Sequence, residues 1–159
     1  ELRPDSLREH MGVARSIEVF HGSIDENVHL GRPHISAEDV REALDAVGLL
    51  DEILRLPDGL NSVLQAGGAP LSQSQLIRLM LARAIVGRPR LLLIDGSLDA
   101  LDDEHTEAVL GRLVAKSAPW TLVICTGRSV VARKCGRTIR LTQTNAVCGR
   151  TADRRCATD

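Results

Sequence analysis

The stretch that decides the fold reads LSQSQLIRLMLARAI at residues 71–85, followed by GRPR at 87–90 and LLLID at 91–95. Ser72 predicts a helix N-cap, because its hydroxyl can accept a hydrogen bond from a free amide of the first turn. Gly87 and Pro89 predict the other end of that helix. Residues 91–94 are all apolar and precede a carboxylate, which is typical of a parallel strand covered on both faces with a functional residue at its C-terminal edge. We therefore expect a largely buried helix beside a buried strand.

This order of elements resembles the ATP-binding domain of ABC transporters. In that family the signature LSGGQ opens such a helix shortly before the Walker B strand and its magnesium-associated aspartate. Here the signature position reads LSQSQ, which comprises Leu71, Ser72, Gln73, Ser74 and Gln75, and the strand is followed by Asp95 and by the segment DALD at 99–102. The resemblance implies an α/β fold: the C-terminal part of a P-loop ABC ATPase domain, with a parallel-sheet core and a helical subdomain.

The same resemblance divides the chain into four parts. Residues 1–24 resemble the Q-loop region of the core, and residues 25–86 resemble the helical subdomain with its signature helix. Residues 87–141 resemble the Walker B half of the core. Residues 142–159 are polar, and we expect them to form a mobile tail.

Local patterns predict further elements within these parts. Ser36 and Asp39 have the spacing of a capping box and predict a helix that ends at Gly48. Other patterns predict a short helix near 49–54, a helix over 103–116, a strand over 121–125 and a final strand over 138–141. Cys125 lies in an apolar run and is expected to be buried.

The signature helix is a candidate phosphate site. A helix N-terminus has unpaired amides and a partial positive charge, which suits an anion. The resemblance implies that residues 71–75 receive the γ-phosphate of ATP bound to a second subunit, with Ser72 as the hydroxyl donor. Gln73 and Ser74 replace the two family glycines and remove backbone freedom, so weakened phosphate binding is predicted. The alternative is that Ser72 serves only as an N-cap.

The hydrolytic residues of the family are replaced in this sequence. The resemblance assigns Asp95 to the hydration shell of Mg²⁺. Gly96 stands in place of the family glutamate that polarises water, Gly127 in place of the family histidine, and Arg15 in place of the Q-loop glutamine. A glycine has no side chain that accepts a proton, so general-base assistance of about 10²–10⁴-fold is lost. We therefore expect a degenerate site with no catalytic residue.

Two aspartates after the strand have two possible roles. The resemblance places Asp99 and Asp102 in the D-loop, which contacts the facing subunit and its nucleotide. Asp102 is also suited to cap the helix over 103–116. The sequence leaves both roles open.

The phosphate-binding loop GxxxxGK[ST] does not occur in these 159 residues. Its nearest approach is Lys116-Ser117, which is expected between a helix and a strand, whereas a phosphate loop follows a strand and opens a helix. The chain also begins without Met. We expect the family's phosphate loop to lie upstream, in a longer parent protein.

Composition limits the other classes of function. With 43% hydrophobic residues the chain can form one core. A formal net charge of −1 gives no reason to expect nucleic-acid binding. Residues 128–159 carry eight Lys or Arg and two Asp, but these charges are scattered and are interpreted as a solvated surface. The four cysteines lack zinc-site spacing.

The prediction is a segment of the ATP-binding domain of an exporter-type ABC transporter, which couples nucleotide-dependent dimerisation to transport. The segment FHGSIDENV at 20–28 resembles exporters. The implied partners are a second ATPase domain and a transmembrane domain, at the cytoplasmic face of the inner or plasma membrane. ATP and Mg²⁺ are expected in the parent, with weak or no binding and no activity in this segment. The alternatives are a non-catalytic ABC-like interaction or regulatory module and, less favoured, a chromosome-structure ATPase head, for which the two aromatic residues offer little base stacking.

Overall fold

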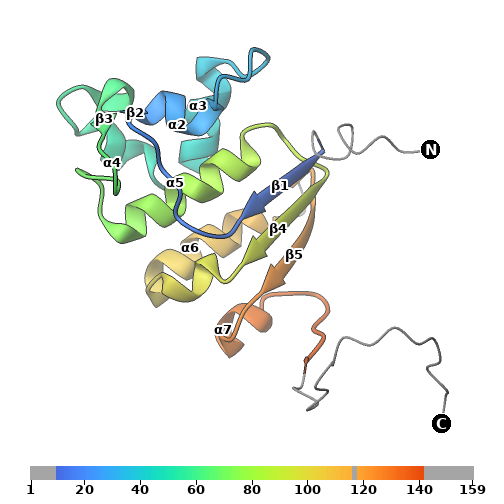
Figure 1. Ribbon diagram of the computed structural model, residues 1–159. Coiled ribbons are helices and arrows are strands. Elements are labelled where there is room, and N and C mark those ends of the chain that lie inside the picture. Colours follow the sequence, from blue (N-terminus) through green and yellow to red (C-terminus); the bar gives the residue numbers. More distant parts are fainter. Residues whose placement is uncertain (1–9, 116–117, 142–159) are drawn as a thin grey trace, which may run out of the picture.

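The computed structural model describes residues 10–115 and 118–141. Along the chain the elements are β1 (Met11–Ala14), β2 (Gly22–Ser23), α2 (Ile24–His29), α3 (Ala37–Ala46), α4 (Leu50–Leu54), the 3-10 helix η1 (Gly59–Asn61), β3 (Val63–Leu64), α5 (Gln73–Ile85), β4 (Leu91–Asp95), the 3-10 helix η2 (Ser97–Ala100), α6 (Asp103–Leu113), β5 (Thr121–Cys125) and α7 (Ser129–Ala132) (Figure 1). The expected tail and the Lys116-Ser117 pair lie outside the described residues.

The predicted buried strand, β4, is the central strand of a parallel sheet. The strand order is β1-β4-β5, and both pairings are parallel. Ala14 lies opposite Ile94, and Ile94 opposite Ile124. The chain is therefore an α/β segment, as expected, and the carboxyl ends of its three strands lie at one edge of the sheet (Figure 1).

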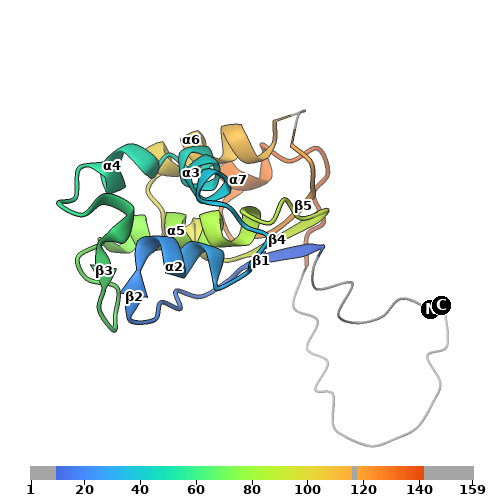
Figure 2. The ribbon, with the colours of Figure 1, turned by 90° about the horizontal axis from the view of Figure 1, so that it is seen from above.

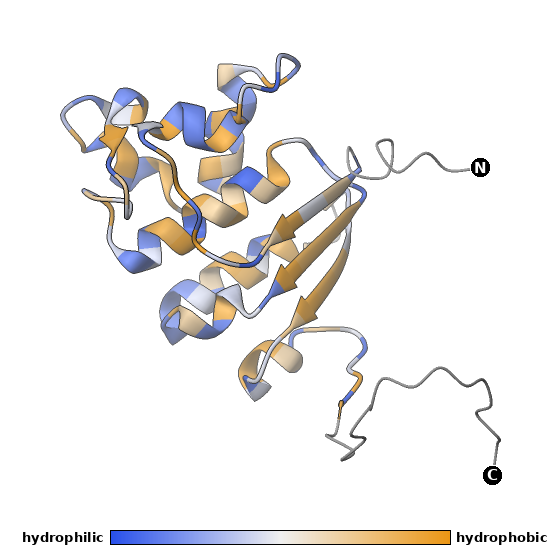
Figure 3. Cartoon of the chain, in the orientation of Figure 1, coloured by the Kyte–Doolittle hydropathy of each residue, from blue (hydrophilic) through white to orange (hydrophobic). Residues whose placement is uncertain are grey.

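The expectation that this strand is covered on both faces is fully met on one face only among the described residues, because Leu91 and Leu93 on the other face are partly exposed. Leu92 and Ile94 are buried, whereas Val13 is 56% exposed and Val123 is 44% exposed. Figures 1 and 2 show the helices gathered on one side of the sheet. Because side chains alternate along a strand, one face meets the helices and the other stays open, although all three strands carry hydrophobic residues (Figure 3). Cys125 shares the open face with Val123 and is exposed, contrary to the expected burial.

Helix α5 packs directly on the sheet beside β1. Ser72 is its N-cap and forms a capping box with Gln75, which confirms the predicted start. At Gly12 of β1, a Cβ atom would lie 2.1 Å from the carbonyl oxygen of Ala84. Such a contact is too short for any side chain, so glycine at this position permits the close packing of strand and helix.

Helices α2, α3 and α4 and the short antiparallel pair β2-β3 form the helical part next to α5 (Figure 2). The capping box of Ser36 and Asp39 is present, as predicted. Asn27 of α2 is fully buried, and its side-chain amide donates to the carbonyl oxygens of Phe20 and Ser23 at 3.1 and 3.0 Å. Arg83 of α5 donates to the carbonyl oxygen of Asn27 at 2.6 Å. These bonds tie the segment after β1 to α5.

Two predicted boundaries need correction. Residues 138–141 form no strand, and Ile139 and Leu141 are 70% and 90% exposed, so the apolar side chains that favoured a strand have no core to pack against. Helix α6 ends at Leu113, with Val114 as C-cap, rather than at residue 116. Within residues 10–115 and 118–141, no helix has both the length and the apolar character that crossing a membrane requires.

Candidate functional site

Asp95 lies at the carboxyl edge of the central strand, next to Arg15. The parallel register pairs Ala14 with Ile94, so the residue that follows β1 lies beside the end of β4. Nε of Arg15 lies 3.4 Å from Oδ2 of Asp95, and both side chains are largely exposed. The hydroxyl of Ser97 donates to the carbonyl oxygen of Arg15 at 2.7 Å. Residue 15 is therefore attached to the loop after β4 through both its backbone and its charge.

Gly96 has a conformational role as well as lacking a side chain. Its φ is +70°, in the left-handed region. Its amide donates to the carbonyl oxygen of Cys125 at 3.0 Å, which joins the ends of β4 and β5. An ideal Cβ atom on Gly96 would meet no atom within 4 Å, so a substitution there is limited by backbone strain rather than by space. That strain is about 1–2 kcal/mol for a residue with a side chain.

Asp99 connects the loop after β4 to the loop after β5. Its Oδ2 accepts a hydrogen bond from the amide of Gly127 at 2.8 Å, and its Oδ1 accepts one from the hydroxyl of Thr126. The structure thus brings Gly127 next to Asp99. The role of Asp99 towards a second subunit stays a prediction.

Arg128, in the loop after β5, makes a second connection between the two loops by donating to residues that follow β4. Its guanidinium donates to the carbonyl oxygens of Leu98 and Leu101 at 2.9 and 2.7 Å and to the hydroxyl of Thr106 at 2.9 Å. It also forms an ion pair with Asp103. The contacts of Asp99 and Arg128 run in opposite directions between the two loops and hold them together.

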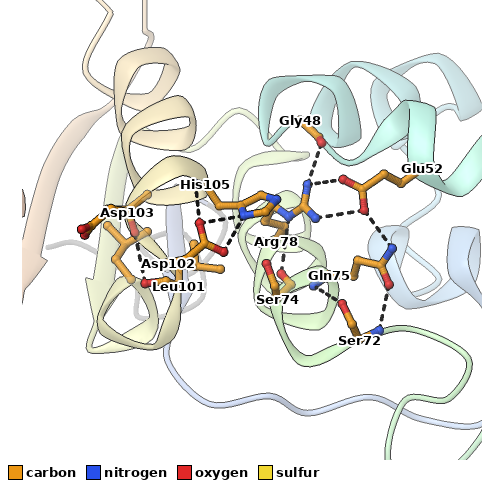
Figure 4. Close-up of polar contacts among 12 residues, drawn as sticks. Gly48, Glu52, Ser72, Ser74, Gln75, Arg78, Leu101, Asp102, Asp103 and His105 are labelled. Carbon is orange, nitrogen blue, oxygen red and sulfur yellow. Dashed lines mark hydrogen bonds and ion pairs between the residues drawn. The ribbon is translucent and has the colours of Figure 1, made fainter.

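Asp102 is the N-cap of α6. Its Oδ1 accepts from the amide of His105 at 2.9 Å, and its Oδ2 lies 2.7 Å from Nδ1 of the His105 ring (Figure 4). The hydrogen bond from that amide, followed by the bond to the ring, holds the pKa of Asp102 below its ordinary value. The capping role predicted for Asp102 is confirmed, while a role in the D-loop stays a prediction.

The signature segment forms the first turn of α5 (Figure 4). The amide of Gln75 donates to Oγ of Ser72 at 3.3 Å, and the amide of Ser72 donates to Oε1 of Gln75 at 2.8 Å. Gln73 and Ser74 are already helical. The Oγ atom of Ser74 is buried and has no hydrogen-bond partner within the described residues. Ser72 is therefore an N-cap, and its proposed contact with phosphate is additional to that role.

A charge cluster, in which Arg78 is buried and Glu52 is partly exposed, joins this first turn to α4 (Figure 4). Arg78 is 3% exposed, and its Nη1 and Nη2 donate to the two carboxylate oxygens of Glu52 at 2.7 and 3.0 Å. Nη1 also donates to the carbonyl oxygen of Gly48 at 2.7 Å. The side-chain amide of Gln75 donates to Glu52 at 2.8 Å. Glu52 thus holds both the capping residue Gln75 and the buried guanidinium.

The cluster predicts a pH dependence of stability. Hydrogen bonding from Arg78 holds the pKa of Glu52 below its ordinary value of 4.5. A carboxyl group whose pKa is lower in the folded state stabilises the fold above the unfolded-state pKa, and this contribution disappears as the pH falls through the folded-state pKa. In urea unfolding at several pH values, the loss of stability below pH 4.5 should be smaller in Glu52→Gln than in the unsubstituted chain. Equal acid sensitivity in the two proteins would contradict this assignment.

The described residues at Asp95 do not fit a magnesium ion without further ligands. Mg²⁺ requires near-octahedral coordination by oxygen. Asp95 supplies one carboxylate, the carboxylate of Asp99 is bonded to the loop after β5, and Arg15 places a positive charge beside Asp95. Within residues 10–115 and 118–141, no group of three or more His, Cys, Asp or Glu is arranged to hold a metal.

Several of these contacts were not predicted from the sequence. Glu52, Arg78 and Arg128 carried no motif that separated them from ordinary surface charges. The contact of Arg15 with Asp95 had no local signal either, because it depends on the parallel pairing of β1 with β4, which places the residue after β1 next to Asp95. Asp99 was predicted for a role between subunits, and its contact within this chain was missed.

Comparison with known proteins agrees with this architecture. No protein-family model matches the chain. The uncharacterized ABC transporter ATP-binding protein YfiB of Bacillus subtilis (strain 168) is 34% identical over 125 residues, which cover 78% of this chain and 22% of that protein. The ABC multidrug transporter MDR2 of Trichophyton interdigitale (strain MR816) is 33% identical over 136 residues, which cover 84% of this chain and 10% of that protein.

A solved structure shows the same similarity. The structure of a bacterial Atm1-family ABC exporter with ATP bound superposes with a TM-score of 0.72 and 31% identity, over 80% of this chain and 23% of that chain. The chain thus spans between 10% and 23% of the length of these three relatives. By its signature helix, its central strand and its relatives, the chain is homologous to part of the ATP-binding region of ABC exporters.

Proposed function

We propose that this chain is a segment of the ATP-binding domain of an exporter-type ABC transporter, in which nucleotide-dependent dimerisation is coupled to transport and the hydrolytic site is degenerate. One observation carries the proposal: the central strand β4 ends at Asp95, and the residue after it is a glycine in the left-handed conformation. The scaffold of the nucleotide site is present, and the side chain that would activate water is missing.

The proposed ligands and partners follow from the relatives. ATP and Mg²⁺ bind in the full-length protein, where the segment from Leu71 to Gln75 at the start of α5 contacts the γ-phosphate of ATP bound to a second ATPase domain. Asp99 and Asp102 face that domain, and Asp95 is the candidate metal ligand. A transmembrane domain of the same or another chain places the assembly at the cytoplasmic face of the membrane. The division into a core half and a helical subdomain at residue 86 is part of the same proposal.

A titration with Mg-ATP tests this proposal. Isothermal titration of the 159-residue chain should show no saturable binding, because no phosphate-binding loop occurs in its sequence. The full-length protein that contains this chain should bind Mg-ATP saturably. Tight stoichiometric binding by the chain, or no binding by a folded full-length protein, would contradict the proposal.

A non-catalytic interaction or regulatory module is the second candidate. It is supported by the contacts of Asp99, which occupy its carboxylate within this chain rather than leaving it free for a second subunit. ATP-dependent association of the full-length protein separates the two candidates. The transporter proposal requires dimers that form with nucleotide, whereas a module that has lost nucleotide dependence would associate equally with and without ATP.

A further inference from the structure

We propose that Arg15 pairs with the Asp95 carboxylate and weakens the binding of divalent metal ions there. The consequence for nucleotide rests on the proposed function: a polyphosphate bound at this edge of the sheet would meet a guanidinium at the place assigned to the metal. Guanidinium groups bind phosphate oxygens in a bidentate manner, so Arg15 is chemically suited to that position.

Strand pairing sets the place of Arg15. Met11 to Ala14 pair in register with Leu91 to Ile94, and the next residue on each strand is Arg15 and Asp95. In parallel strands that run side by side, these two side chains leave the sheet at the same edge. The observed separation of 3.4 Å between Nε of Arg15 and Oδ2 of Asp95 agrees with this placement.

Ser97 holds the backbone of residue 15 at that edge. Its hydroxyl donates to the carbonyl oxygen of Arg15 at 2.7 Å, although the two residues are 82 positions apart in the chain. Ser97 is 8% exposed, so this hydrogen bond is sheltered from water. The long arginine side chain is exposed, but this bond fixes the backbone from which it extends beside Asp95.

Two other charged side chains at this edge already have partners among the described residues. Asp99 accepts hydrogen bonds from the loop after β5, and Arg128 pairs with Asp103 and with backbone carbonyl oxygens. Asp95 is consequently the carboxylate at which a metal ion would bind. The metal ion would have to compete with Arg15 for it. Repulsion between the guanidinium and a dication about 6 Å away in a water-like medium corresponds to a roughly tenfold loss of affinity.

Titration with Mn²⁺ alone tests this inference on the 159-residue chain. Mn²⁺ is a paramagnetic substitute for Mg²⁺, and it broadens the NMR signals of nearby backbone amides even when binding is weak. In ¹⁵N-labelled Arg15→Gln, the amides of residues 95–97 should broaden at roughly tenfold lower Mn²⁺ concentration than in the unsubstituted chain. Arg90→Gln is the matched control, because it removes one positive charge at the opposite end of β4.

The second variant is Asp95→Asn in the Arg15→Gln background. It should abolish the increased sensitivity of the amide signals to Mn²⁺. Equal broadening in Arg15→Gln and the unsubstituted chain would overturn the inference. An equal gain in Arg90→Gln would also overturn it, because the effect would then come from net charge. The amide spectra report whether each variant is folded. Since no nucleotide is present, a failure of this test is distinct from a failure of the Mg-ATP titration.

Discussion

Replacing Glu52 with alanine is expected to lower the free energy of unfolding by about 1.5–3 kcal/mol, the range for hydrogen bonds to a charged group. The guanidinium of Arg78 is 3% exposed and has its two charge-assisted bonds to Glu52. Among the described residues, the partners that then remain for the buried guanidinium are the carbonyl oxygens of Gly48 and, more distantly, Ser74. Removing the carboxylate is costly because the buried guanidinium of Arg78 has lost its hydration and would no longer be compensated. Urea unfolding measures the difference.

Asp51→Ala is the matched control for this prediction. Asp51 is an exposed carboxylate next to Glu52 in the same turn of α4, and its loss should change stability by at most about 0.5 kcal/mol. The double variant Glu52→Ala with Arg78→Met should be more stable than Glu52→Ala, because the unpaired buried charge is then removed. If Glu52→Ala costs no more than Asp51→Ala, the cluster contributes little to the fold.

The same variant bears on the signature helix. Glu52 accepts a hydrogen bond from the side chain of Gln75, whose Oε1 is bonded to the amide of Ser72. Loss of Glu52 therefore removes the tertiary contact that orients the capping box. Amide hydrogen exchange in the first turn of α5 should increase more than exchange in its last turn, which contains Arg83 and packs against α2.

Introducing a glutamate and a histidine at two of the three positions where the proposed hydrolytic residues are replaced is expected to have the largest effect on activity. In the full-length protein, Gly96→Glu with Gly127→His should raise ATP hydrolysis by about 10²–10⁴-fold, which is the usual contribution of general-base assistance. Both positions lie at the carboxyl edge of the sheet, where Asp99 holds the amide of Gly127. A histidine Cβ at this position would lie 3.6 Å from the Asp99 carboxylate, an ordinary contact. Steady-state phosphate release measures the gain.

Gly96→Gln with Gly127→His is the matched control. Glutamine has the size of glutamate and imposes the same backbone strain at φ +70°, about 1–2 kcal/mol, but it is not a base. Hydrolysis should therefore rise in the glutamate variant and stay low in the glutamine variant. Equal activity of the two variants, with folding and ATP binding intact, would count against the assignment of Gly96 to the position of the catalytic base.

Local patterns predicted much of the fold. Interactions between near neighbours in the chain define where several helices and strands begin or end. Examples are the capping residues Ser36 and Ser72, the apolar run before Asp95, and the glycine and proline after α5. The prediction failed where burial decided the outcome. Residues 138–141 have a strand-like composition, but they lie exposed and unpaired, and Cys125 faces outwards although its neighbours are apolar.

The candidate site divides in the same way. The prediction of a degenerate nucleotide site needs only the sequence. It rests on glycine at 96 and 127, arginine at 15, and Gln73 and Ser74 in place of two family glycines. Only the tertiary structure revealed three sets of contacts: the ion pair of Arg15 with Asp95, the bonds from Asp99 to the loop after β5, and the Glu52–Arg78 cluster. Each joins residues far apart in sequence, which strand register and helix packing bring together, and no local pattern encodes such a meeting.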